Sequence, residues 1–453
     1  MSDFRASIAV YHDRRMFRIL LLGAMSGFPW VLIGSSLSLW LSEDGLSRSA
    51  VGWAGLIFSI YAINFLWAPL IDRIRIPGLA HKIGQRKAWI ICFQAVILLS
   101  LLGWSLLRPA EDIWLVIAIG LVIATASASQ DITIDALRIE QINPSEKSSM
   151  AAAAAIHVTG WWSGYKIGGI VAFFAADMLQ NAGFANYWQL TFIGLSGFVF
   201  LANIGLLFIP EVSADARIKA QKKEQETLAQ RIGTNDGFAR LVAFLGSTIW
   251  GPLASFFRQN GFAIGLGILG FVLLFKVGEA FMGKMSLIFY SEIGFSKSDI
   301  ALYSKGLGWI TTVAFTLLGG FFAIRSGAVR ALFIAGIAMA ATNIMFSILA
   351  WTGKSEWLFA VAVLLDDIAA AFATVAFVTF ISLLVDRTYT ATQYALLASI
   401  GTIGRTTLAA SSGALVDGLG GDWGLFFVIT ALMVLPSLGL LWILRHKIQL
   451  NAN

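Results

Sequence analysis

Apolar residues occur along the whole chain in long runs that are separated by shorter polar stretches. A helix needs about 20 apolar residues to cross the hydrocarbon core of a bilayer, and each run is close to that length. The pattern predicts membrane-spanning helices at residues 17–41, 49–71, 88–107, 112–136, 148–176, 188–209, 262–289, 299–324, 328–352, 356–385, 391–417 and 423–444. We therefore expect an all-α, polytopic membrane protein with twelve transmembrane helices.

The composition agrees with this prediction, and the positions of the basic residues predict the orientation in the membrane. Hydrophobic residues make up 58% of the chain and charged residues 13%, whereas soluble domains are about 25% charged. Most of the 32 Lys and Arg lie in the N-terminal segment, the even-numbered loops and the C-terminus. By the positive-inside rule both termini face the cytoplasm. The net charge of +6 therefore reflects membrane topology, and no nucleic-acid partner is expected.

The longest loop divides the predicted helices into two sets of six. It begins with a polar stretch and continues with mixed apolar, aromatic and basic residues, which are typical of an interfacial amphipathic helix. We therefore expect a six-helix bundle at 1–209, a cytoplasmic linker at 210–261 and a second six-helix bundle at 262–453. Two such halves are typical of a secondary transporter that works by alternating access. A monomer in the lipid bilayer is expected.

Charged residues flank the predicted loop between the second and third helices. Asp72 and Arg73 follow the second helix, and Arg86 and Lys87 precede the third. The arrangement resembles the loop signature of major facilitator transporters, in which these charges form a latch on the cytoplasmic side. The alternative is that the long basic side chains only extend to the membrane surface.

Ionisable side chains also occur inside the predicted helices. Each would cost about 2.5–3.5 kcal/mol at the centre of a lipid bilayer, so we expect them to face an aqueous cavity or one another. They are Asp131, Asp135, Lys166, Lys276, Glu279, Lys284, Lys305, Asp366, Asp367 and Arg405. Among them, Lys284 and Lys305 lie near the outer ends and are expected to extend to the membrane surface.

Two pairs have the spacing of ion pairs on a helix. Asp135 and Arg138 are three residues apart and are expected to pair at the cytoplasmic membrane surface. Lys276 and Glu279 have the same spacing near the middle of the seventh predicted helix. This second pair either neutralises itself or takes part in function.

Four acidic residues are candidates for carrying a proton: Asp131, Glu279, Asp366 and Asp367. A carboxyl group without a cationic partner in a medium of low dielectric constant tends to be neutral, and it can exchange a proton when water reaches it. Proton-coupled transport requires a group of this kind. We therefore predict coupling to a proton gradient, with no cofactor, metal site or catalytic residue.

Basic and aromatic residues in the fifth and eleventh predicted helices are candidates for substrate binding. Lys166 and Arg405 lie deep in these helices and could hold an anionic substrate, with Arg405 able to bind a carboxylate in a bidentate manner. Trp161, Trp162 and Tyr165 lie close to Lys166 in the sequence and offer faces on which sugar rings stack.

Several motifs, in the same order along the chain, resemble those of AmpG-type muropeptide permeases, a branch of the major facilitator superfamily. They are "GAMSGFPWVL" (23–32), "FLWAPLIDR" (65–73), "SASQDITIDA" (127–136), "KVGEAF" (276–281) and "ATQYALLAS" (391–399). The resemblance extends through nearly all twelve helices. Gln130 and Asp131 match the signature pair of the family, which makes Gln130 a further candidate for substrate contact. The linker and the region of Asp366 and Asp367 do not match a family motif.

The resemblance implies import of N-acetylglucosaminyl-1,6-anhydro-N-acetylmuramyl peptides across the bacterial inner membrane, driven by protons. Such import serves cell-wall recycling and, in some bacteria, signals induction of β-lactamase. Two alternatives remain open. Acetyl-CoA transporters resemble the same branch, and their substrate is also anionic. An intramembrane prenyl-transferring enzyme would instead hold Mg²⁺ on aspartate-rich motifs, for which "QDITIDA" (130–136) has the spacing.

Overall fold

The computed structural model describes residues 9–46, 54–211, 215–232, 237–295 and 308–448. Every regular element in these ranges is helical, and the elements follow the predicted membrane-spanning helices in order. Eight stretches are long and apolar enough to cross a membrane, and the shorter helices Gly55–Leu66 and Thr311–Ser326 are also apolar. The prediction of an all-α membrane protein is confirmed.

In the first half of the described chain the second membrane helix is interrupted, whereas the first is one continuous helix that includes a stretch of π-helix, η2. The membrane helices of this half are α2 (Arg14–Trp30), η2 (Val31–Ser36) and α3 (Leu37–Glu43); η3 (Gly55–Ser59), α5 (Ile60–Ile63), η4 (Asn64–Leu66) and α6 (Ala68–Arg73); α8 (Gln85–Trp104), α9 (Pro109–Glu140), α10 (Lys147–Asn181) and α11 (Tyr187–Leu207). The short elements η1 (Val10–His12) and α7 (Ala80–Ile83) lie outside these helices.

The second half has the same overall plan. Its elements are α14 (Phe262–Leu274) and α15 (Val277–Ile293); α17 (Gly308–Ser326), α18 (Ala328–Thr352) and α19 (Glu356–Leu384); η6 (Arg387–Tyr389), α20 (Thr390–Thr407), η7 (Leu408–Ser411) and α21 (Ser412–Gly418); α22 (Trp423–Leu432) and α23 (Leu435–Leu444). Between the halves lie α12 (Asp215–Ile232) and α13 (Gly237–Asn260).

Two interruptions in these helices were not predicted. The second membrane helix is broken at Trp67, whose backbone has φ −110° and ψ −2°, and it restarts as α6 with Pro69 in the first turn. Proline lacks the N–H that a continuous helix would need there. The seventh is broken at Lys276, with φ −107° and ψ 11°. Both breaks lie beside polar side chains of the candidate site described below.

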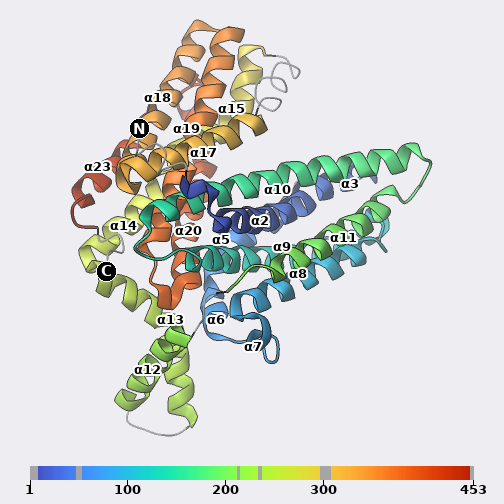
Figure 1. Ribbon diagram of the computed structural model, residues 1–453. Coiled ribbons are helices and arrows are strands. Elements are labelled where there is room, and N and C mark those ends of the chain that lie inside the picture. Colours follow the sequence, from blue (N-terminus) through green and yellow to red (C-terminus); the bar gives the residue numbers. More distant parts are fainter. Residues whose placement is uncertain (1–8, 47–53, 212–214, 233–236, 296–307, 449–453) are drawn as a thin grey trace.

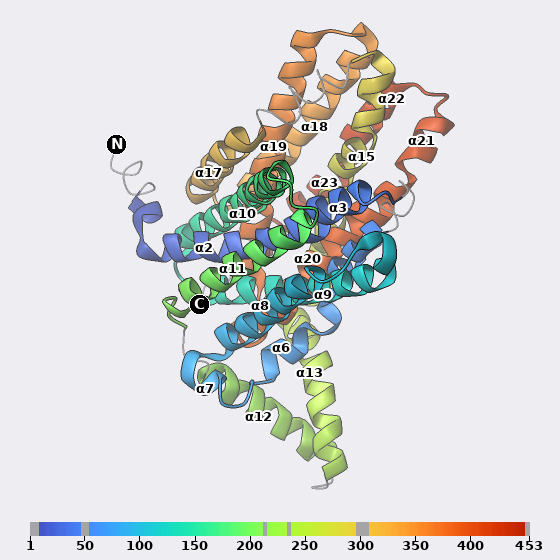
Figure 2. The same cartoon turned by 90° about the vertical axis from the view of Figure 1, so that its right-hand side faces the viewer.

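The two halves contact each other at one end and diverge towards the other (Figure 1). The end in contact is the one where α12 and α13 lie, and we call it the linker side. Figure 2 shows the same arrangement from a second direction, with α6, α12 and α13 together at this end. At the linker side, Tyr11 donates a hydrogen bond to the Leu317 carbonyl, 3.2 Å away. The structure is therefore closed on the linker side.

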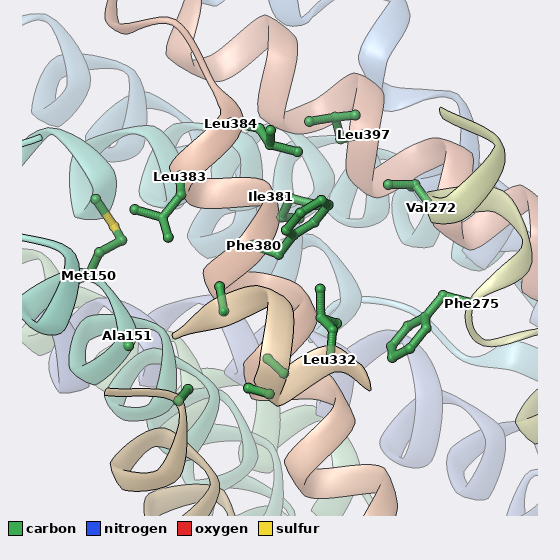
Figure 3. Packing of buried hydrophobic residues seen from close by; sticks show 14 of the residues in the cluster. Met150, Ala151, Val272, Phe275, Leu332, Phe380, Ile381, Leu383, Leu384 and Leu397 are labelled. Carbon is green, nitrogen blue, oxygen red and sulfur yellow. The ribbon is translucent and has the colours of Figure 1, made fainter. Parts of the chain in front are cut away.

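A hydrophobic core joins the halves at the linker side. In Figure 3, Met150 of α10 lies beside Leu383 of α19, with Ala151 nearby, whereas Phe380 of α19 points away from α10 into the second half. All four side chains are at most 5% exposed. Apolar area buried between the halves contributes roughly 25 cal/mol per Å², so this contact stabilises the closed linker side without any charged group.

Glycines allow α2 and α10 to pack closely. A Cβ atom at Gly160 would overlap the Leu20 carbonyl oxygen, whereas one at Gly169 of the same helix would meet no atom within 4 Å. Gly160→Ala is therefore expected to lower the free energy of unfolding by about 1–3 kcal/mol, and Gly169→Ala to raise it by up to about 1 kcal/mol. Thermal unfolding of both variants in the same detergent tests this. Equal effects of the two substitutions would contradict the close contact.

Candidate functional site

The SASQD segment of α9 connects α9 to the first two membrane helices. Tyr61 donates a hydrogen bond to the Ser127 hydroxyl at 2.7 Å, and the Trp67 indole N–H donates to Ser129 at 2.9 Å. Ser26 donates to the Asp131 carboxylate at 2.6 Å. Because Tyr61 and Trp67 belong to the interrupted second helix, the motif fixes the position of that helix.

Gln130 is fully buried within the first half. Its side-chain oxygen accepts a hydrogen bond from Gln94 at 2.7 Å, and its side-chain nitrogen donates to the Met25 carbonyl at 2.8 Å. Both ends of the amide thus form hydrogen bonds with other helices of the same half. The contact of Gln130 with substrate stays a prediction; in this conformation its amide is held on both sides, which leaves little free capacity for a ligand.

The predicted pair of Asp135 and Arg138 lies inside the protein and not at the membrane surface. Arg138 is completely buried, and its guanidinium nitrogen is 2.9 Å from the Asp135 carboxylate. The same guanidinium donates to Ser382 of the second half at 3.0 Å. His157 lies 3.6 Å from Asp135. The pair therefore contributes to the contact between the halves, which the sequence spacing did not indicate.

An aromatic cluster lines the first half near Lys166. The ring of Trp161 lies 5.4 Å from Trp30 and 5.7 Å from Tyr165, measured between ring centroids. The Lys166 ammonium nitrogen is 5.9 Å from the centroid of Trp162 and 5.8 Å from that of Tyr165. A half-buried cation next to aromatic faces can bind a ligand that carries both an anionic group and a sugar ring.

Sequence reasoning missed part of this aromatic cluster. Trp30 also contacts Tyr61 at 4.8 Å and Phe58 at 4.7 Å between centroids. These three residues come from the first two membrane helices. Their common face could not be recognised because it forms between two different helices, and spacing along one helix does not indicate contacts with another.

A polar cluster in the second half surrounds the break between α14 and α15. The Lys276 ammonium is 3.2 Å from the Glu279 carboxylate and donates to Thr374 of α19 at 2.8 Å. Asp366 accepts a hydrogen bond from Thr342 at 3.0 Å, and Asp367 beside it is half-buried. Lys276 is thus held between an acidic group and a hydroxyl group inside the bundle.

The two predicted substrate-binding cations lie in different halves. Lys166 is half-buried on α10, whereas Arg405 is exposed in the last turn of α20. The predicted extension of Lys284 to the surface agrees with its exposure on α15, and Lys305 lies outside the described residues.

The charges predicted to form a latch take part in a buried network on the linker side. The Arg86 guanidinium is 2.7 Å from Asp72 and 2.8 Å from Glu140, and Arg86 and Asp72 are at most 1% exposed. Arg217 of the linker helix α12 contacts Glu140 at 2.5 Å. Two basic residues from distant parts of the chain therefore share one buried carboxylate.

Asp72 also connects this network to the second half. Its carboxylate accepts a hydrogen bond from the Thr392 backbone N–H at 2.8 Å and another from the Thr392 hydroxyl at 2.6 Å. Arg73 lies next to it and is half-buried. Thr392 belongs to the ATQ motif at the start of α20, so two of the family-like motifs are in direct contact.

Lys87 contributes its backbone to the same region. The Glu211 carboxylate accepts hydrogen bonds from the backbone N–H groups of Arg86 and Lys87, at 2.8 and 2.9 Å. Burial raises the pKa of Glu211, and the two N–H donors oppose this effect by favouring the charged carboxylate. The start of the linker is thus anchored at the N-terminus of α8.

The alternative of a magnesium-dependent enzyme requires a cluster of carboxylates. Among the residues that the structure describes, His, Cys, Asp and Glu do not come together in any group of three or more with the geometry of a metal site. Asp131 and Asp135 lie in the first half, and each is bound to a different partner, Ser26 and Arg138. The geometry therefore gives no support to that alternative.

Comparisons with known proteins agree with the arrangement described above. No family model matches the chain. A transporter named AmpG 4 from Rickettsia conorii is 31% identical over 440 residues, which cover 97% of this chain and 99% of that protein. An anhydromuropeptide permease from Escherichia coli strain K12 is 28% identical over 443 residues, which cover 98% of this chain and 82% of that protein.

Solved structures show the same fold. The proton:xylose symporter XylE of the major facilitator superfamily has a TM-score of 0.65 at 13% identity, covering 95% of this chain and 94% of its own. The transporter FucP in the outward conformation has a TM-score of 0.66 at 14% identity, covering 96% of this chain and 99% of its own. This chain belongs to the AmpG family of transporters and is a multi-pass membrane protein with the fold of the major facilitator superfamily.

Proposed function

We propose that this protein imports N-acetylglucosaminyl-1,6-anhydro-N-acetylmuramyl peptides across the bacterial inner membrane, driven by a proton gradient. The name of the Escherichia coli relative supports this substrate class. The observation that carries the proposal is the position of Lys166 beside Trp162 and Tyr165. A disaccharide can stack on the aromatic rings while an anionic group of the peptide binds the ammonium.

The proposed mechanism is alternating access. The two six-helix halves, 1–209 and 262–453, would rock about a site near the middle of the membrane. The linker side would face the cytoplasm, because it carries most of the basic residues. In the described conformation this side is closed, so the substrate would enter from the periplasm. Release would require the contacts of Asp72 with Thr392 to break.

The geometry narrows the choice of the proton-coupling acid. Glu279 is 3.2 Å from Lys276 and is thus paired with a cation. Asp131 and Asp366 each accept a hydrogen bond from a hydroxyl group, and no Lys or Arg in the described part of the chain forms an ion pair with either. A carboxyl group without a cationic partner is the better candidate for taking up a proton at neutral pH.

Uptake of a labelled anhydromuropeptide into proteoliposomes, with and without an imposed proton gradient, tests the proposal. We expect accumulation that depends on the gradient.

Lys166→Gln is expected to raise the KM for uptake about tenfold, since a hydrogen bond to a charged group contributes about 1.5–3 kcal/mol. Arg108→Gln, which removes a charge at an exposed position, is the control. Absence of accumulation by the folded, inserted protein would refute this substrate, and unchanged KM for Lys166→Gln would refute the role of Lys166.

A further inference from the structure

A cavity with a basic lining opens on the linker side, at the contact between the halves. Its volume is about 400 Å³. Lys147 at the start of α10, Arg330 in the first turn of α18, and Arg445 and His446 after α23 contribute to the lining. No Asp or Glu is among the described residues that line it. The electrostatic potential in the cavity is therefore positive, which favours an anionic ligand.

Two helices begin at this cavity. The first residues of α10 and of α18 line it. The N-cap of α18 is Gly327, which has no side chain, and the N-cap of α10 is Glu146, whose carboxylate is paired with Arg15 at 2.7 Å and does not cap the helix. The α18 helix follows Gly327, which has φ +78°. The N-terminus of a helix presents free N–H groups and a partial positive charge, and both favour an oxygen anion such as phosphate.

A buried hydroxyl group in the cavity has no hydrogen-bond partner. Thr379 of α19 lines the cavity and is 1% exposed. Its side-chain oxygen forms no hydrogen bond with any residue that the structure describes. Buried polar groups are nearly always hydrogen-bonded, so an orphan of this kind indicates a missing partner. A ligand oxygen in the cavity would supply that partner.

We propose that the cavity binds a phosphate group. A phosphate offers several acceptor oxygens, which match the guanidinium of Arg330, the ammonium of Lys147, the free helix N–H groups and the Thr379 hydroxyl. Lys147 belongs to the first half, whereas Arg330 and Thr379 belong to the second. A bound phosphate therefore bridges the halves and stabilises the closed linker side. The phosphate is the headgroup of an anionic phospholipid or part of a soluble compound, since the cavity lies where membrane helices end.

The test is a binding measurement on the purified full-length protein and involves no transport, so its result is independent of the substrate proposed above. The temperature of unfolding is measured against increasing inorganic pyrophosphate, with sodium chloride at equal ionic strength as the control. A parallel series uses mixed micelles containing phosphatidylglycerol or, as the control, phosphatidylcholine. A ligand that binds the folded state raises the unfolding temperature with increasing concentration.

Two variants and one matched control locate the site. Arg330→Gln is expected to weaken binding about tenfold, because it removes a charge-assisted hydrogen bond. Thr379→Val is expected to weaken binding about threefold without lowering the unfolding temperature of the protein alone, since it removes an unpartnered hydroxyl group. Arg325→Gln, which removes the charge of a residue stacked on Phe321 outside the cavity, is expected to bind as the unmodified protein does.

The outcomes are distinct. A response to pyrophosphate alone assigns a soluble phosphate compound, a response to phosphatidylglycerol alone assigns a lipid headgroup, and both responses support the site for either source. The proposal is overturned if neither probe raises the unfolding temperature above its control. It is also overturned if Arg330→Gln and Arg325→Gln weaken the response equally, because the response would then depend on the net charge of the protein and not on this cavity.

Discussion

Arg86→Gln should open the linker side of the transporter. Arg86 is completely buried between the carboxylates of Asp72 and Glu140, and removal of one partner from a buried ion pair destabilises by about 3–5 kcal/mol. Asp72 accepts a hydrogen bond from Thr392 of the second half in this closed conformation. Opening of the linker side would separate the two residues and let water reach the Asp72 carboxylate. The variant is therefore expected to shift from the closed towards the open conformation.

Labelling of a cysteine between the halves measures this shift. Ala395 is 2% exposed and packs against Ala68 and Ile71 of the first half. The native Cys92 is the only cysteine, so Ala395→Cys in a Cys92→Ser background gives a single reporter. The labelling rate follows the fraction of molecules whose linker side is open. If the substitution shifts the equilibrium between closed and open by only about 1.4 kcal/mol, labelling accelerates about tenfold.

Two further variants make this result specific. Lys82→Gln removes an exposed positive charge on the same side and should leave the labelling rate unchanged. Arg217→Gln should accelerate labelling less than Arg86→Gln, because Glu140 keeps its contact with Arg86. An unchanged rate in a folded Arg86→Gln variant would show that the network does not hold the linker side closed.

The fold could be predicted from the sequence because the membrane restricts the possible structures. Backbone polar groups must be satisfied within the lipid, so a long apolar run is almost always a helix. The interruptions at Trp67 and Lys276 could not be predicted in the same way. The side chains at these breaks find partners in the protein interior, where the Lys276 ammonium donates to Thr374 and the Trp67 indole donates to Ser129. Such tertiary partners leave no local pattern.

The candidate site was predicted less completely than the fold, for a related reason. Spacing along a helix indicated that Asp135 could pair with Arg138 and Lys276 with Glu279, and both pairs are in contact. Spacing could not indicate partners from other helices. Arg217 comes from a linker that looks solvated in sequence, yet it is 8% exposed and bound to Glu140. The charge pattern of a linker therefore does not reveal which of its residues is buried.

Asp131→Asn is expected to uncouple transport from the proton gradient. The asparagine side-chain oxygen can still accept the hydrogen bond from Ser26, so the packing around it is retained, but the side chain can no longer take up a proton. Ser26 lies one helical turn from Trp30 of the aromatic cluster. The protonation state of Asp131 can therefore be transmitted to the site where the substrate is expected to bind.

A difference of about one pH unit supplies about 1.4 kcal/mol per proton, which allows about tenfold accumulation for each proton transported with a substrate. The Asp131→Asn variant should equilibrate labelled anhydromuropeptide across the liposome membrane without accumulating it, while exchange between internal and external substrate continues. Asp177→Asn, at an exposed position near the end of α10, is the control and should accumulate the labelled substrate normally.

Asp366→Asn is the decisive comparison, because Asp366 also has a hydroxyl partner. Loss of accumulation in only one variant identifies the coupling acid. Normal accumulation in both would exclude each of them and leave coupling to Glu279 or Asp367.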